Sequence, residues 1–289
     1  MTTNTPERHI TFTCRDGLSL FCRDFGPQPP NATPVLCLPG LTRNSKDFIP
    51  LSQRYGNSRR FLCPDLRGRG LSEWDSEYNR YFPPTYVEDM WELLAFLGIE
   101  KVTIIGTSLG GLMAMIMASI RPEAVSGVIL NDVGPEVNHE GLRRVYEYVG
   151  LLPKVDDWAE TVRQVKKVYE IGLPDLDEDA WLEHAKRQYR EDANGVPRLE
   201  YDPGIGKALR EMGGVPVDLW TLFEGLRDVP TLALRGAISD ILSQETFDRM
   251  GEVKPDLARA IIPNRGHVPL LDEPACIAAI DEFLARKSP

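Results

Sequence analysis

The sequence predicts an α/β protein built on a doubly wound, mostly parallel, eight-stranded sheet. Short continuous apolar runs such as 34–38 and 102–105 are typical of strands buried on both faces. Helical patterns follow several of these runs at short spacing, as right-handed strand-helix-strand units require. The chain of 289 residues also has room for one large core and an insertion.

The first two strands are expected to form an antiparallel hairpin. Residues 9–14 and 18–24 alternate with period two around the turn at 15–17. The six buried strands that follow are predicted at 34–38, 61–64, 102–105, 128–130, 231–234 and 258–262. Helices of the core are predicted from 85 to 97, where Thr85 and Glu88 form a capping-box pattern, and at 109–120, 244–252 and 274–286.

The composition changes between the strands at 128–130 and 231–234. Apolar β-like runs disappear, and amphipathic helical stretches take their place at 139–149, 156–171, 178–191, 205–212 and 217–226. We therefore expect residues 1–134 and 227–289 to form the core and 135–226 to form a helical cap. Trp158, Trp181 and Trp220 are expected to pack within this insertion.

Charge and cysteine content limit the class of protein. The net charge of −10 argues against nucleic acid or an anionic membrane as partner. The sequence shows neither a signal peptide nor an apolar run long enough to span a bilayer. The cysteines lack metal or redox spacing and are expected to be reduced core residues of a cytoplasmic protein: Cys14, Cys22, Cys37, Cys63 and Cys276.

Ser108 is the candidate nucleophile. It lies between a predicted strand and a predicted helix, with Gly106 and Gly110 two positions before and after it. A serine on such a sharp turn needs glycines there, because side chains would collide with the neighbouring backbones. The turn also directs the N–H of Leu109 and the helix N-terminus toward the serine, where negative charge would develop.

Asp240 and His267 are the candidate acid and base. Each follows the carboxyl end of a predicted parallel strand, as Ser108 does, and open α/β sheets place their sites at that edge. Serine needs an imidazole to take its proton, and the imidazole needs a carboxylate to orient it. The other three histidines lie on the first strand or in the insertion. Asp132, after the preceding strand, is an alternative to Asp240.

These motifs resemble the α/β-hydrolase fold superfamily, in particular its lidded serine hydrolases. The resemblance covers almost the whole chain and rests on the GxSxG turn and on the order Ser108, Asp240, His267. It implies an oxyanion hole formed by the backbone N–H groups of Leu41 and Leu109.

Two loops extend the comparison with that superfamily. Residues 65–72 resemble its DxRGxGxS loop, which we interpret as a structural turn beside the site. Pro39-Gly40 replaces the His-Gly that is frequent after the third strand, so the conformation of the loop at 39–42 is left open.

The resemblance implies a hydrolase that cleaves an ester, lactone or thioester through an acyl-enzyme, as carboxylesterases and enol-lactonases do. The apolar and aromatic content of the insertion indicates a small, mainly apolar substrate. Thr107 precedes the nucleophile where relatives that cleave carbon-carbon bonds of ring-fission products often have Asn. Such a hydrolase, or a ligand receptor with little turnover, remains an alternative, whereas dehalogenases and epoxide hydrolases carry Asp in place of Ser108.

No bound cofactor or metal is expected, because the sequence lacks a P-loop, a dinucleotide fingerprint and an HExxH motif. The expected partner is a small-molecule substrate. Neither nucleic acid nor a membrane is expected to bind, and the sequence leaves a homo-oligomer open.

Overall fold

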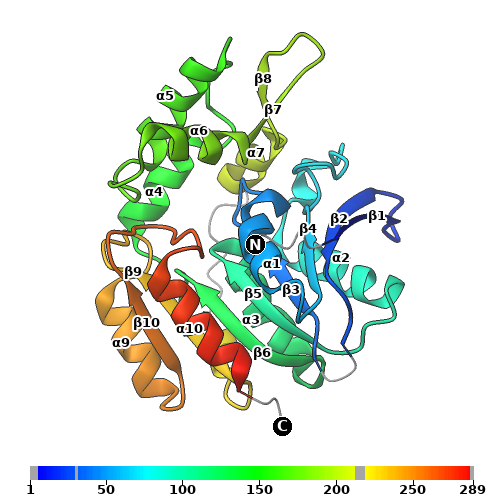
Figure 1. The fold of residues 1–289 in the computed structure, drawn as a ribbon, viewed down its shortest axis with the longest axis vertical. Coiled ribbons are helices and arrows are strands. Elements are labelled where there is room, and N and C mark those ends of the chain that lie inside the picture. The colour runs from blue at the N-terminus through cyan, green and yellow to red at the C-terminus, as the bar shows by residue number, and fades with distance from the viewer. Residues whose placement is uncertain (1–5, 30–31, 212–218, 287–289) are drawn as a thin grey trace.

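The central element is an eight-stranded mixed sheet with the strand order β1-β2-β4-β3-β5-β6-β9-β10 (Figure 1). This computed structural model describes residues 6–29, 32–211 and 219–286. The strands are β1 (Glu7–Thr13), β2 (Ser19–Phe25), β3 (Val35–Leu38), β4 (Phe61–Pro64), β5 (Val102–Thr107), β6 (Val125–Asn131), β9 (Thr231–Gly236) and β10 (Ala258–Ile262). The β1–β2 and β2–β4 pairs are antiparallel, and the strands β4, β3, β5, β6, β9 and β10 run parallel to one another. The predicted sheet is therefore confirmed.

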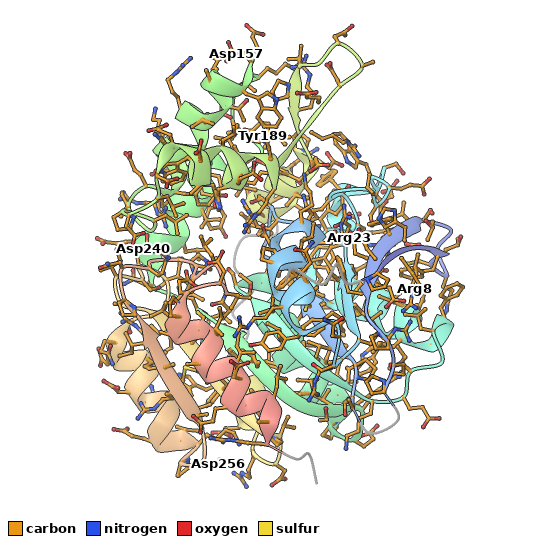
Figure 2. All side chains as sticks on the ribbon, in the orientation of Figure 1. Arg8, Arg23, Asp157, Tyr189, Asp240 and Asp256 are labelled. Atoms are coloured by element: carbon orange, nitrogen blue, oxygen red, sulfur yellow. The ribbon has the colours of Figure 1, made fainter. Side chains whose placement is uncertain are left out.

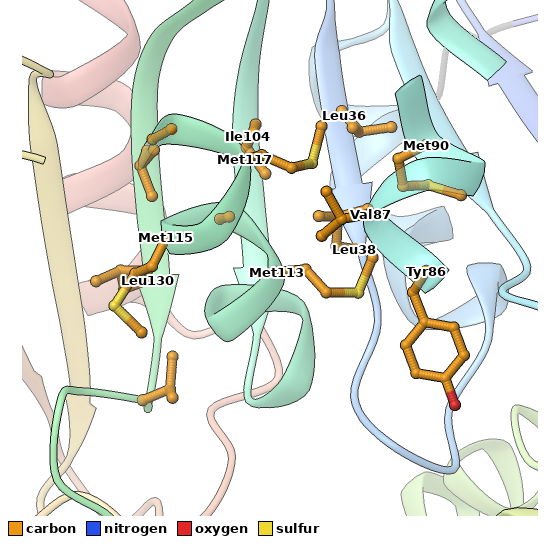
Figure 3. Close-up of a cluster of buried hydrophobic side chains, with 14 of the residues drawn as sticks. Leu36, Leu38, Tyr86, Val87, Met90, Ile104, Met113, Met115, Met117 and Leu130 are labelled. Carbon is orange, nitrogen blue, oxygen red and sulfur yellow. The ribbon is translucent and has the colours of Figure 1, made fainter. Parts of the chain in front are cut away.

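Helices cover both faces of this sheet. They are α1 (Ile49–Tyr55), α2 (Pro83–Phe96), α3 (Leu109–Ile120), α9 (Gln244–Val253) and α10 (Pro274–Ala285), with 3-10 turns η1 (Ser45–Phe48), η2 (Tyr78–Arg80) and η3 (Pro122–Ala124). Alternate residues of β3 face opposite layers, because successive side chains of a strand point to opposite sides. Leu36 and Leu38 join the cluster under α2 and α3 (Figure 3), whereas Val35 and Cys37 join the cluster with α1 and α10.

One local prediction was wrong, and one helix had no prediction. Helix α2 begins at Pro83, with Phe82 as an N-cap that makes no side-chain hydrogen bond, so Thr85 does not start the helix. Proline suits the first helical turn because its missing N–H has no partner there anyway. Helix α1 was not predicted.

The predicted helix at 178–191 is shorter than expected. Helix α6 (Glu178–Lys186) ends early, and the chain then forms a small antiparallel hairpin of β7 (Tyr189–Glu191) and β8 (Pro197–Leu199). The Asp192 carboxylate accepts hydrogen bonds from the N–H groups of Asn194 and Val196 at 2.8 and 3.1 Å. This turn closes the hairpin, and an Asp followed by Asn-Gly is a turn signal that the helical periodicity concealed.

The insertion between β6 and β9 covers the carboxyl ends of the parallel strands (Figure 1). Besides α6 and the hairpin it contains α4 (His139–Tyr148), α5 (Trp158–Tyr169), α7 (Gly204–Glu211) and α8 (Leu219–Glu224). The predicted positions 212, 217 and 218 lie outside the described residues. The division into a core of 1–134 and 227–289 and a cap of 135–226 stays a prediction.

The tryptophans of the insertion pack as expected. Trp181 is buried in a separate apolar cluster with Val165 and Tyr189, and Trp158 lies against the same cluster. Trp220 instead packs against the main core, where α8 contacts α3. The insertion thus has an apolar cluster of its own, while α7 (Gly204–Glu211) and α8 (Leu219–Glu224) pack against the main core.

Two further findings concern the described residues. They contain no helix with the length and apolar character needed to cross a bilayer. All five cysteines are buried as free thiols, in agreement with their prediction as core residues.

Arg67 joins the loop after β4 to α2. Its side chain is 1% exposed, and its guanidinium donates to both carboxylate oxygens of Asp89 at 2.8 and 2.6 Å. It also donates to Asp75 at 2.6 Å and to the exposed Asp16 at 2.9 Å. Because Asp75 and Asp89 are themselves buried, the single cation offsets two buried anions.

We predict that Arg67→Met lowers the free energy of unfolding by about 3 to 5 kcal/mol, because it leaves buried carboxylates without their cation. Urea denaturation followed by circular dichroism measures the change. Arg163→Met, at an exposed position of α5, is the control and should change stability by no more than about 0.5 kcal/mol. A loss below about 1 kcal/mol for Arg67→Met would contradict the role of the network.

Candidate active site

Ser108 occupies a sharp turn between β5 and α3. Its backbone has φ 52° and ψ −115°, a strained conformation for a residue with a side chain. A Cβ on Gly106 would lie 2.3 Å from the carbonyl oxygen of Gly110, and one on Gly110 would lie 2.1 Å from that of Leu38. The two glycines are therefore required by the close approach of strand and helix, for the reason inferred from the sequence.

His267 joins Ser108 to a buried carboxylate. The Nε2 atom of His267 lies 2.9 Å from the Ser108 hydroxyl, and Nδ1 lies 2.8 Å from Oδ2 of Asp132. A carboxylate at Nδ1 favours the tautomer with the proton on that nitrogen. The Nε2 lone pair then faces the serine hydroxyl and can accept its proton.

Asp132 follows β6 directly and is fully buried. Besides His267, it accepts hydrogen bonds from the N–H of Gly236 at 2.8 Å and the hydroxyl of Ser239 at 2.6 Å. These two donors come from the end of β9 and its loop. The carboxylate is thus fixed by the neighbouring strand and stabilised as an anion.

The prediction that Asp240 orients His267 is wrong. The Asp240 carboxylate accepts two hydrogen bonds from Arg144 of α4 at 2.9 and 3.0 Å. Figure 2 shows Asp240 near the outer edge of the molecule beside α4. Since β6 lies between β5 and β9, both acids follow strands close to Ser108. Their spacing along the chain therefore did not distinguish the two acids. In the structure, Ser239 donates its hydroxyl to Asp132, whereas the next residue, Asp240, binds Arg144 of the insertion.

The loop after β3 is held beside the serine by the loop after β4. The Leu41 carbonyl accepts from Nε of Arg69 at 2.9 Å, and the Ser45 N–H donates to Asp65 at 2.7 Å. The 65–72 loop therefore holds the loop after β3 in place, in agreement with its interpretation as a structural turn. Leu109 is the first residue of α3, where an N–H has no intrahelical acceptor. The oxyanion role of Leu41 and Leu109 stays a prediction.

A cavity of about 420 Å³ connects Ser108 and His267 with the insertion. Leu41 and Leu109 line it near the serine. Most of the remaining wall is apolar or aromatic and includes Phe82, Leu112, Val137, Leu142, Val145, Tyr148, Ile205, Leu209 and Leu219. The cavity can therefore hold a small molecule whose body is mainly apolar.

His184, Arg43 and Arg187 add polar groups to the cavity wall that sequence analysis did not identify. Burial lowers the pKa of His184 well below 6.5, and the positive charges of Arg43 and Arg187 lower it further. His184 is therefore neutral at neutral pH, with one ring N–H donor and one acceptor. No sequence motif marks these three residues, because Arg43 comes from the loop after β3, whereas His184 and Arg187 come from α6 and its C-terminal end.

We predict that this shift makes stability depend on pH. A histidine whose pKa is lower in the folded protein binds its proton more readily when unfolded, so stability falls as the pH drops below 6.5. His184→Phe should reduce this fall in the free energy of unfolding, measured by urea denaturation from pH 7 to about 5. The exposed His139→Asn is the control, and equal pH slopes for wild type and His184→Phe would refute the prediction.

The hydrogen-bonded series Asp132, His267 and Ser108, on a strand-to-helix turn, is the arrangement typical of serine hydrolases. The chain belongs to the α/β-hydrolase fold family, because the sequence model described as alpha/beta hydrolase fold matches residues 33–274. Among the described residues, no group of three or more His, Cys, Asp or Glu side chains is arranged to hold a metal ion.

Individual relatives agree with this assignment. An alpha/beta hydrolase of known crystal structure from Novosphingobium aromaticivorans has 41% identity and a TM-score of 0.92, covering 97% of this chain and 98% of its own. The 3-hydroxybutyrate-oligomer hydrolase of Cupriavidus necator is 33% identical over 88% of this chain and 89% of its own length. The 2-(acetamidomethylene)succinate hydrolase of Mesorhizobium japonicum is 27% identical over 81% of each chain. This chain is thus a hydrolase of the α/β fold.

Proposed function

We propose that the protein is a serine hydrolase that cleaves a carboxylic ester of a small substrate through an acyl-enzyme. The observation that carries this proposal is the continuous hydrogen-bonded series from Asp132 through His267 to Ser108, which opens into the cavity. Lactones and thioesters follow the same chemical route and belong to the same proposed class.

The reaction begins when the Ser108 oxygen attacks the ester carbonyl carbon and Nε2 of His267 accepts the serine proton. The N–H groups of Leu41 and Leu109 stabilise the resulting oxyanion. His267 then donates the proton to the departing alkoxide, which leaves as an alcohol. A water molecule, whose proton His267 accepts, then attacks the acyl-enzyme. His267 returns this proton to the departing Ser108 oxygen, so the acid and the free serine hydroxyl are released.

Asp132 acts through His267 in both half-reactions. Its negative charge stabilises the imidazolium that forms when the serine or the water loses its proton. Gly236 and Ser239 donate hydrogen bonds that keep the carboxylate in place, so it can orient the imidazole.

The relative from Cupriavidus necator supports ester chemistry, since its name specifies oligomers of a hydroxy acid. The relative from Mesorhizobium japonicum is less similar in sequence, and its name specifies a different substrate. A substrate panel of esters, lactones and ring-fission products separates the proposed activity from carbon-carbon bond hydrolysis.

We predict that Ser108→Ala abolishes labelling by a fluorophosphonate and lowers kcat on short p-nitrophenyl esters by roughly 10⁶-fold. The exposed Ser58→Ala is the control and should keep both properties. Full turnover by Ser108→Ala would refute the mechanism. Labelling of the wild type without turnover across the substrate panel would instead indicate a ligand receptor.

We also predict a contrast between the two acids. Asp132→Asn should lower kcat by about 10⁴-fold, because the amide favours the wrong imidazole tautomer. Asp240→Asn changes a partner of Arg144 and not of His267, so its kcat should stay within about tenfold of wild type. Steady-state kinetics on one ester measures kcat for both variants. A larger loss of kcat in Asp240→Asn than in Asp132→Asn would indicate that Asp240 is the catalytic acid of the triad.

A further inference from the structure

Arg43 lines the cavity and carries one unpaired donor. Its side chain is 9% exposed and stacks near the ring of Tyr169, with the guanidinium carbon 5.9 Å from the ring centroid. Asp47 accepts hydrogen bonds from Nε and Nη2 of Arg43. The remaining nitrogen, Nη1, is buried and has no partner among the described residues. An unpaired buried donor is costly, and a ligand acceptor would remove that cost.

His184 supplies a second unpartnered group on the same wall. It is 6% exposed, and neither ring nitrogen has a hydrogen-bond partner among the described residues. Edge-to-face packing against Tyr169 and Trp181, with centroids 5.3 and 6.0 Å away, fixes the ring. The imidazole is thus held rigidly with its polar atoms unused, in a part of the molecule where native proteins normally pair such atoms.

Arg187 supplies an unbalanced positive charge. It follows α6, lines the cavity, and its guanidinium forms no ion pair or hydrogen bond that the described part of the chain accounts for. The two other cavity arginines are neutralised, Arg43 by Asp47 and Arg144 by Asp240. Asp272 is within electrostatic range of Arg187, but the two form no salt bridge. Among the three cavity arginines, Arg187 is therefore the one with no ion-pair partner among the described residues.

This polar wall and the nucleophile belong to one cavity. A Cβ placed on Gly40 would lie 3.4 Å from Cγ of Arg43 and 3.9 Å from Cβ of Ser108, so both side chains border the same small space. On the other side, Tyr169 lies between Arg43 and His184 and lines the same cavity. A single small substrate can therefore contact Ser108 and the polar wall at once.

We propose that Arg43, His184 and Arg187 form a subsite for a carboxylate of the substrate, at the opposite end of an apolar segment from the scissile ester. This inference rests on the proposed ester hydrolysis and names its substrate class. Arg187 supplies the charge, and the Nη1 group of Arg43 and the ring N–H of His184 supply hydrogen bonds. A short ester of a hydroxy acid has this chemistry, because it carries an internal ester and a free terminal carboxylate.

The test compares two substrates that differ only in that group: the linear dimer of 3-hydroxybutyrate and its terminal primary amide. Wild type should prefer the acid. Arg187→Gln should lower kcat/KM for the acid by about 10- to 100-fold, as expected for a lost charged hydrogen bond, and leave the amide within about threefold. His184→Phe, which keeps the ring packing, should lower the acid value by about tenfold and spare the amide.

The exposed Arg163→Gln is the matched control for a lost positive charge on the insertion and should leave the acid-to-amide ratio unchanged. An unchanged ratio in Arg187→Gln, with both substrates still cleaved, would overturn the subsite and leave the proposed hydrolysis standing.

A binding measurement tests the subsite independently of ester hydrolysis. Ser108→Ala should bind the acid dimer, measured by calorimetry, and the double variant with Arg187→Gln should bind it at least about tenfold more weakly. If the affinity depends on Arg187 in this way but wild type cleaves no ester, the subsite is supported and the proposed hydrolase is refuted. Equal affinity in the single and double variants would overturn the subsite.

Discussion

The hydrogen bond between Asp132 and His267 is the interaction on which the site depends. It joins the end of β6 to the loop after β10, and the same carboxylate accepts donors from the end of β9. Three strands are therefore connected through one buried anion. Because the groups are buried and the partners are fixed by the sheet, the imidazole has one orientation, and that orientation directs Nε2 toward Ser108.

The serine side of the site is fixed by backbone packing. Gly106 and Gly110 allow β5 and α3 to approach closely, and Ser108 between them has a strained backbone conformation. The loops after β3 and β4 are joined by hydrogen bonds from Arg69 and to Asp65, which place Leu41 next to the serine. The sheet domain thus supplies the chemistry, and the insertion supplies most of the cavity wall.

The insertion also sets the electrostatics of the cavity. Arg144 and Arg43 lie beside their own carboxylates, whereas Arg187 has none in ion-pair contact within the described structure. A mainly apolar cavity with one excess positive charge distinguishes an anionic ligand from a neutral one of the same shape, because charge in a low-dielectric pocket is expensive to leave unpaired. In the proposed function, bond cleavage rests on the sheet domain, whereas substrate selection rests on the insertion together with Arg43.

The sequence by itself determined the sheet, the strand-to-helix turn at Ser108 and the position of His267. These features depend on local periodicity and on glycine spacing, which are properties of neighbouring residues. Only the tertiary structure decided between Asp132 and Asp240, since both follow strands beside the site and the choice depends on which way a side chain turns. It also decided that Arg43 lines the same cavity as His184 and Arg187, because Arg43 lies far from the other two in the chain and the insertion packs over the sheet.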